Sequence, residues 1–97
     1  MTLETMSVVV AELNKRGIDA TLEYPGWIRM TLPNGNSLNG GDVNETFDID
    51  LCDASTCDVI ETIGSTIPSD CTDVQRIADH CACTYSEGVE TNAKEGR

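Results

Sequence analysis

Apolar residues recur at three- and four-residue intervals near the start of the chain, at Leu3, Met6, Val9, Val10 and Leu13. This spacing predicts an amphipathic helix with one apolar stripe. Thr2 is suited to cap the start of the helix, and Lys15-Arg16-Gly17 supplies a basic last turn followed by a glycine stop. Because three consecutive valines lower helix propensity, we expect packing of the stripe to hold this helix in place.

The pattern then changes to that of short strands. Residues 20–24 and 27–32 are rich in β-forming side chains and flank Pro25-Gly26, the pair that a type II turn requires. Turn-forming residues at 33–36 predict a second turn, and those at 39–42 predict a third flexible point. Any strand between these two points is therefore expected to be short.

The clearest strand signal lies at residues 46–51, where apolar and polar side chains alternate. Phe47, Ile49 and Leu51 share one face of an extended chain, and Asp48 and Asp50 share the other. This alternation predicts a half-buried strand with an acidic outer face. We expect its apolar side chains to form the core together with the stripe of the first helix.

A further strand and a second helix complete the pattern. Residues 57–63 favour a strand, and Pro68-Ser69-Asp70 predicts a break before the helix. Thr72 and Gln75 have the spacing of a capping box at the helix start. The apolar stripe of this helix is formed by Val74, Ile77, Ala78 and Cys81.

The fold class follows from the order of these elements. A helix, three or four mostly antiparallel strands and a second helix predict a two-layer α+β domain. We assign a single domain to residues 1–86. No periodicity is visible after Tyr85, so we predict that residues 87–97 form a disordered tail.

The chain is strongly and unevenly acidic. Its 97 residues include 17 acidic and 6 basic ones, which gives a net charge of −11. Residues 42–90 hold twelve of the acidic residues and a single basic one, Arg76. Direct nucleic-acid binding is not expected, because contacts to phosphates need Lys or Arg. The charge fits either a surface that only keeps the protein in solution or an acidic face for a basic partner.

The chain has five cysteines, at Cys52, Cys57, Cys71, Cys81 and Cys83. An odd number of cysteines without a recognisable secretion signal predicts free thiols in a reducing compartment. We expect Cys81 to be a small core residue because it lies on the helix stripe. Cys52 and Cys57 flank a loop and could form a disulfide if the protein meets an oxidant.

Two groups of residues resemble metal sites only in part. Four residues could supply zinc ligands: Cys52, Cys57, His80 and Cys83. Their spacing lacks the two closely spaced ligand pairs of most structural zinc sites. Asp48, Asp50 and Asp53 are spaced like the start of a calcium-binding loop, but its glycine and final glutamate are missing. We therefore predict no metal and no other cofactor.

An enzymatic role is not favoured either. His80 is the only histidine, so any nucleophile–histidine pair would have to include it. The glycines at 39–42 lack the lysine and the following helix of a phosphate-binding loop. We therefore predict that the protein is not an enzyme.

These properties favour a small binding protein with an acidic contact surface. We expect it to occupy a basic, normally nucleic-acid-binding surface of a protein partner, as an inhibitor or a nucleic-acid mimic does. The same profile is common among short phage and mobile-element proteins that inhibit host nucleases or CRISPR complexes. The residues expected to contact the partner are Asp48, Asp50, Asp53, Asp58, Asp73 and Asp79.

Two other functions stay open at this point. The chain could be an accessory module that binds a protein through an apolar hairpin, with its acidity serving solubility alone. It could also be a metal or redox protein built on its cysteines. No apolar run reaches the roughly 18–20 residues that a membrane span needs, so we expect no membrane partner. The expected compartment is the cytoplasm, or the host cytoplasm if the protein is phage-encoded.

Overall fold

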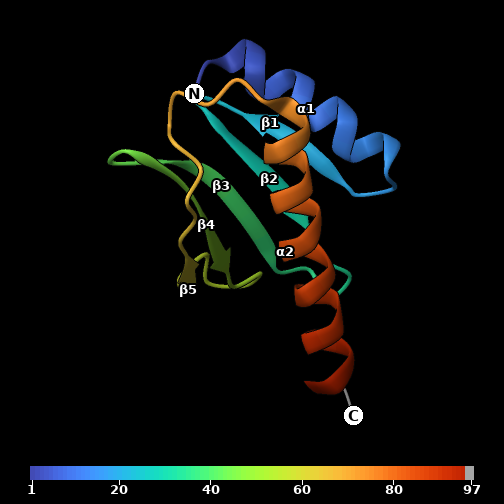
Figure 1. Ribbon diagram of the computed structural model, residues 1–97. Helices are drawn as coiled ribbons and strands as arrows, with labels where there is room; N and C mark the ends of the chain where they lie inside the picture. The colour runs from blue at the N-terminus through green and yellow to red at the C-terminus, as the bar shows by residue number, and fades with distance from the viewer. Residues whose placement is uncertain (96–97) are drawn as a thin grey trace.

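Two helices cover one face of a five-stranded antiparallel sheet, as Figure 1 shows. The computed structural model describes the backbone of residues 1–95 and the side chains of residues 1–90. The elements are α1 (Leu3–Lys15), β1 (Ala20–Glu23), β2 (Trp27–Thr31), β3 (Ser37–Val43), β4 (Thr46–Cys52), β5 (Val59–Ile63) and α2 (Val74–Glu95). Neighbours in the sequence are neighbours in the sheet, in the order β1-β2-β3-β4-β5. The two-layer α+β fold is confirmed, although the sheet has five strands where three or four were predicted.

The additional strand is the segment that contains Gly40 and Gly41. These glycines were predicted to form a flexible point, yet both lie inside β3 and pair with β4. Gly40 faces the helices, where the ring of Phe47 occupies its side-chain space: a Cβ on Gly40 would lie 2.5 Å from Phe47 Cζ. The glycine is therefore required by a close approach across two strands and does not mark a turn. The chain reverses later, where Asn44 adopts a φ of 58°.

The helix ends follow capping chemistry. In α1, the backbone N–H of Thr5 donates to Oγ1 of Thr2 at 3.1 Å, and Gly17 has a φ of 83° after the last turn, as predicted. In α2, the backbone N–H of Arg76 donates to Oδ1 of Asp73 at 3.2 Å. The predicted capping box at Thr72 is therefore wrong by one residue, since the carboxylate of Asp73 occupies the cap position directly before Val74.

α2 continues to Glu95, into the segment predicted as a tail. Val89 packs against the core, and a Cβ on Gly88 would lie 3.1 Å from Leu32 Cδ2. The turn of α2 around Gly88 therefore contacts the loop between β2 and β3, a tertiary contact that the local sequence pattern does not reveal. Residues 96–97 of the predicted tail lie outside the described residues.

The first hairpin turn differs from the prediction as well. The Tyr24–Pro25 peptide bond is cis, and Gly26 does not adopt a positive φ. A type II turn needs a positive φ at its third residue, the position expected for Gly26, so the turn between β1 and β2 is not of this type.

The core lies between the helices and the sheet. Val9, Leu13, Ile49 and Ile77 are completely buried, which confirms these four predicted core residues, whereas Leu3 of the predicted helix stripe is 42% exposed. Cys81 is buried with them, and burial raises the pKa of its thiol to about 12. None of the helices within residues 1–95 has the length and apolar character needed to span a membrane.

Candidate binding face

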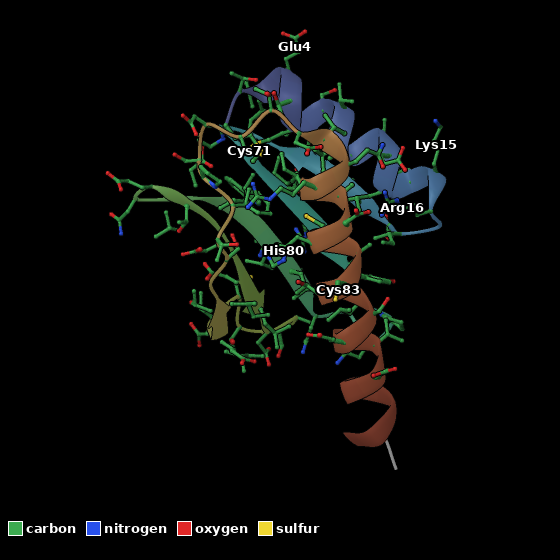
Figure 2. All side chains as sticks on the ribbon, in the orientation of Figure 1. Glu4, Lys15, Arg16, Cys71, His80 and Cys83 are labelled. Atoms are coloured by element: carbon green, nitrogen blue, oxygen red, sulfur yellow. The ribbon has the colours of Figure 1, made fainter. Side chains whose placement is uncertain are left out.

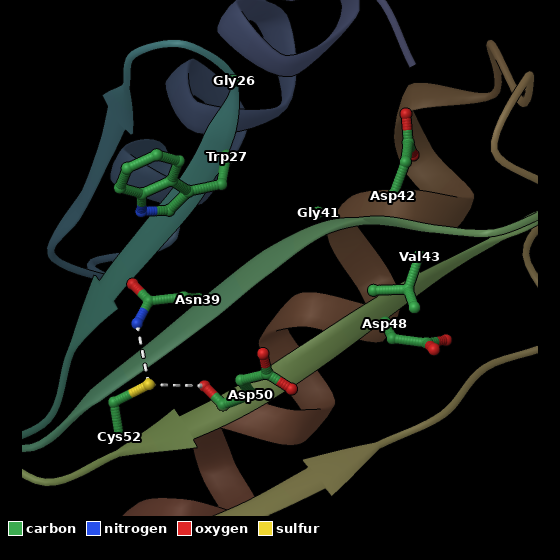
Figure 3. A pocket seen from close by; sticks show the side chains of 9 residues that line it. All are labelled: Gly26, Trp27, Asn39, Gly41, Asp42, Val43, Asp48, Asp50 and Cys52. Atoms are coloured by element: carbon green, nitrogen blue, oxygen red, sulfur yellow. Dashed lines mark hydrogen bonds between the residues drawn. The ribbon is translucent and has the colours of Figure 1, made fainter. Parts of the chain in front are cut away.

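The sheet face opposite the helices is not covered by any described element, and we call it the open face. It is formed by the residues that alternate with the buried ones on β2, β3 and β4: Trp27, Arg29, Asn39, Gly41, Asp48, Asp50 and Cys52. Figure 3 shows the side chains of Trp27, Asn39, Asp50 and Cys52 on the side of the sheet away from α2. The predicted acidic outer face of β4 is thus the central part of this face.

Strand register places the two aspartates beside β3. Asp48 pairs with Gly41, and Asp50 pairs with Asn39. Asn39 in turn pairs with Arg29 on β2. Trp27 adjoins Gly41, since a Cβ on Gly41 would lie 3.5 Å from Trp27 Cβ. The fold therefore brings an aromatic ring and two carboxylates together from strands that are separated in the sequence.

A hollow of about 350 Å³ lies between these side chains. Trp27 and Gly26 line one side, Asp48 and Asp50 line the other, and Asn39 lies between them (Figure 3). A smaller hollow of about 120 Å³ adjoins it and extends to residues of the β4–β5 loop. The open face is therefore a shallow groove with acceptor groups along one wall and an indole along the other.

Each of the two aspartates is held in place through one of its carboxylate oxygens, Oδ1. Oδ1 of Asp48 accepts from Thr46 Oγ1 at 3.0 Å and from the backbone N–H of Ser65 at 3.3 Å. Oδ1 of Asp50 accepts from Thr62 Oγ1 at 2.8 Å. Neither carboxylate forms an ion pair with a side chain of residues 1–90. Their negative charge is therefore fixed in position without being neutralised.

The arginine side chains of the described part of the chain form their ion pairs and hydrogen bonds with groups other than Asp48 and Asp50. Arg16 pairs with Glu12 and Asp79 on the helix layer. Arg29 reaches toward β1, where its Nη1 lies 3.8 Å from Oε1 of Glu23. Arg76 donates to the backbone oxygen of Thr66 at 3.3 Å.

Asn39 connects β3 to β4 through its side chain. Its Nδ2 donates to Cys52 Sγ and to Ser37 Oγ, both at 3.2 Å. Its Oδ1 is buried and has no hydrogen-bond partner among the described residues. Figure 3 shows this oxygen directed toward Trp27. The groove thus holds a carbonyl acceptor that lacks a donor.

The predicted contacts Asp53 and Asp58 lie in the loop that leads from β4 to β5. Oδ1 of Asp53 accepts from Ser55 N, Ser55 Oγ and Thr56 N at 2.8, 2.7 and 3.1 Å. These bonds lower the pKa of Asp53, because they favour the charged carboxylate. Asp58 is exposed, and its backbone oxygen accepts from Asp53 N at 2.9 Å. Asp53 therefore shapes the loop, and Asp58 presents a charge at the edge of the sheet.

The other two predicted contacts are on the helix layer. Asp73 caps α2, and Oδ1 of Asp79 accepts from Arg16 Nη1 at 2.8 Å. Both helices cover the sheet face opposite Asp48 and Asp50. The six predicted aspartates therefore do not form one surface, because the sheet separates them.

The single histidine is not part of the open face. His80 projects from α2 toward the sheet (Figure 2), and its Nε2 is buried with no hydrogen-bond partner among the described residues. Burial lowers the pKa of His80, while the charges of Glu87 and Asp48 oppose this effect. A side chain in this position is not available as a general base for a molecule bound in the groove.

The cysteines are free thiols distributed over both layers. Cys52 lines the groove, Cys57 and Cys83 are exposed, and Cys71 is partly buried. Within residues 1–90, no group of three or more histidine, cysteine or acidic side chains is arranged to hold a metal ion. The zinc and calcium arrangements considered from the sequence are therefore not brought together in the described part of the chain.

Comparison with known proteins gives no guide to function: no family model matches the chain, and no curated protein or solved structure matches it significantly. The function is therefore inferred from geometry and charge.

Proposed function

We propose that this chain is a small non-enzymatic binding protein whose open face occupies a basic, normally nucleic-acid-binding surface of a protein partner. The observation that carries the proposal is the pair of unneutralised carboxylates, Asp48 and Asp50, fixed side by side on a sheet face that no described element covers. Alternate residues of a strand stand about 6.6–6.8 Å apart. They present a short row of negative charge to lysines and arginines that bind phosphates.

The residues of this surface are Asp48 and Asp50 at its centre, with Asp53 and Asp58 at its border. Asp73 and Asp79 are not included, because the sheet lies between them and the open face. Binding of this kind excludes nucleic acid from the partner, which makes the protein an inhibitor or nucleic-acid mimic of the type encoded by phages and mobile elements. The proposed compartment is the cytoplasm in which such a partner acts.

The test compares the Asp48→Asn/Asp50→Asn variant with the unchanged protein in capture of partners from nuclease-treated lysate. Asparagine keeps an Oδ1 acceptor for Thr46, Ser65 and Thr62, so the fold is expected to persist. We expect the variant to lose most of the captured partner and the unchanged protein to be displaced by added nucleic acid. Binding should also weaken between roughly 50 and 300 mM salt, over which the Debye length more than halves.

A matched control removes two charges elsewhere. Glu4 and Asp19 are exposed and make no ion pair within residues 1–90. Glu4 projects from α1 (Figure 2), and Asp19 precedes β1. The Glu4→Gln/Asp19→Asn variant should bind like the unchanged protein. If both double variants bind alike, and salt has no effect, the acidic open face serves solubility alone.

A second function has one observation in its favour. Tyr24 is 74% exposed at the tip of the first hairpin, close in sequence to the partly exposed Trp27. This hairpin would suit an accessory module that binds a protein through apolar contact. In that case Tyr24→Ala would abolish capture, and neither salt nor the Asp48→Asn/Asp50→Asn change would affect it.

A further inference from the structure

We propose that the groove of the open face receives an arginine side chain of the partner, with its guanidinium between Trp27 and Asp50. This inference rests on the proposed function and names the chemistry that the site recognises. The groove differs from an ordinary acidic surface in having a hollow of about 350 Å³ with an aromatic wall. This volume is within the range of small ligand sites.

Gly41 forms the floor beside the aromatic wall. A Cβ at this position would lie 3.5 Å from Trp27 Cβ and 3.8 Å from the backbone oxygen of Gly26. Without that Cβ, the indole borders an open floor, as Figure 3 shows. Trp27 keeps 36% of its surface exposed, so a planar cation can contact the ring. Tryptophan is the aromatic side chain that attracts cations most strongly.

The opposite wall offers hydrogen-bond acceptors. The Oδ1 atoms of Asp48 and Asp50 are held by donors of the sheet, and no hydrogen bond from residues 1–90 reaches either Oδ2. The buried Oδ1 of Asn39 likewise lacks a donor in the described part of the chain. Nδ2 of the same side chain already donates to Cys52 Sγ and to Ser37 Oγ. An occupant that brings several N–H groups and no acceptor completes this arrangement.

An arginine fits these features better than a lysine does. Its guanidinium is planar, stacks on aromatic rings and donates in a fork that matches a carboxylate. A lysine ammonium is a compact, strongly hydrated charge without a planar face, so it gains less from an aromatic wall. Arg29 of this chain is on the same face, yet it reaches toward Glu23 on β1. A second copy of the chain is not the expected occupant, because each copy has a net charge of −11.

The test uses tetra-arginine and tetra-lysine peptides, which have equal charge and differ in the cation. Trp27 is the only tryptophan in the chain, so its fluorescence reports on the groove directly. We expect both peptides to bind with salt-dependent affinity, and tetra-arginine to bind about 2- to 5-fold tighter, the range of a cation–π contact at an exposed site. Only tetra-arginine should change the Trp27 emission.

Variants separate the stacking contact from the charge. Trp27→Leu should abolish the preference for arginine and leave the affinity for tetra-lysine unchanged. Because this variant has no tryptophan, calorimetry measures its peptide binding. Asp50→Asn should lower the affinity for both peptides. The control Glu4→Gln removes one negative charge far from the groove, so it should lower neither affinity by as much as Asp50→Asn does.

The outcomes also separate this inference from the proposed function. If both peptides bind equally, leave Trp27 emission unchanged and depend on Asp48 and Asp50, the arginine inference is wrong and the basic-surface function stands. If peptide binding is indifferent to Asp48→Asn/Asp50→Asn, both proposals are wrong. If neither peptide binds, the arginine inference is wrong, and capture of a partner by the unchanged and double-variant proteins decides the function.

Discussion

Arg16, just beyond the last turn of α1, donates from Nη1 to Oδ1 of Asp79 on α2 at 2.8 Å. The same guanidinium donates to Glu12 and to Gln75, each at 3.0 Å, so it connects the two helices (Figure 2). The pKa of Arg16 is raised by Asp79 first and by Glu12 second. Asp79 thus has a partner within the chain, on the layer that does not include the open face.

We predict that Asp79→Asn lowers the melting temperature slightly at low salt and leaves partner binding unchanged. The loss should be small because the pair is exposed to solvent, and it should shrink as salt screens the charges. Thermal melts at two salt concentrations measure the first effect, and the lysate capture assay measures the second. An Asp79→Asn variant that binds as weakly as Asp48→Asn/Asp50→Asn would place α2 in the contact surface after all.

Two adjacent glycines in β3 should respond to the same substitution with very different losses of stability. In Gly40→Ala, the new methyl group would lie 2.5 Å from Cζ of the completely buried Phe47. Overpacking of this kind costs about 1–3 kcal/mol of unfolding free energy. In Gly41→Ala, the nearest contact is an ordinary 3.5 Å to Trp27 Cβ, so the change should stay within about 0.5 kcal/mol.

Chemical denaturation of both variants checks this pair. The double variant Gly40→Ala/Phe47→Leu should recover part of the loss, because leucine vacates the space of the ring. Equal stabilities for the two alanine variants would mean that the Phe47 ring does not lie over Gly40.

The protein should lose stability as the pH falls through about 6.5, the ordinary pKa of histidine. The folded state lowers the pKa of His80 through burial. Folding therefore favours the neutral ring, and the stabilisation is complete above the unfolded pKa and declines below it. His80 is the only histidine in the chain, and the carboxylates of Glu87 and Asp48 moderate the effect without reversing it.

Melting temperatures between pH 7.5 and 5.5 measure this decline. In His80→Gln the slope over this range should be flatter, since the titrating group is gone while a polar side chain is kept. Parallel pH profiles for the two proteins would show that His80 protonation is not coupled to folding.

Cys81 should resist alkylation in the folded protein. It is completely buried, and burial raises the pKa of its thiol to about 12, so almost no thiolate is present at pH 8. Cys57 and Cys83 are exposed and should react with iodoacetamide first. Peptide mass spectrometry in native buffer and in denaturant measures the order, and native labelling of Cys81 at the rate of Cys57 would contradict it.

The elements that the sequence predicted well are those whose periodicity comes from one buried face. The stripe of α1 and the alternation of β4 identify Val9, Leu13 and Ile49 as core residues, because a side chain on the inner face must be apolar whatever packs against it. The outward position of Asp48 and Asp50 follows from the same alternation. The acidic face of β4 could therefore be predicted without knowledge of the other strands.

Only the tertiary structure decided what lies beside that face. The pairing of β3 between β2 and β4 places Trp27, Asn39 and Asp50 around one groove, and no local pattern relates residues so far apart in the sequence. Gly40 and Gly41 have the composition of a turn, yet both pair with β4 as part of β3, where Gly40 leaves room for the ring of Phe47. Asp73 and Asp79 were separated from the acidic face for the same reason: the layer to which a helix belongs is fixed by long-range packing and not by the charge it carries.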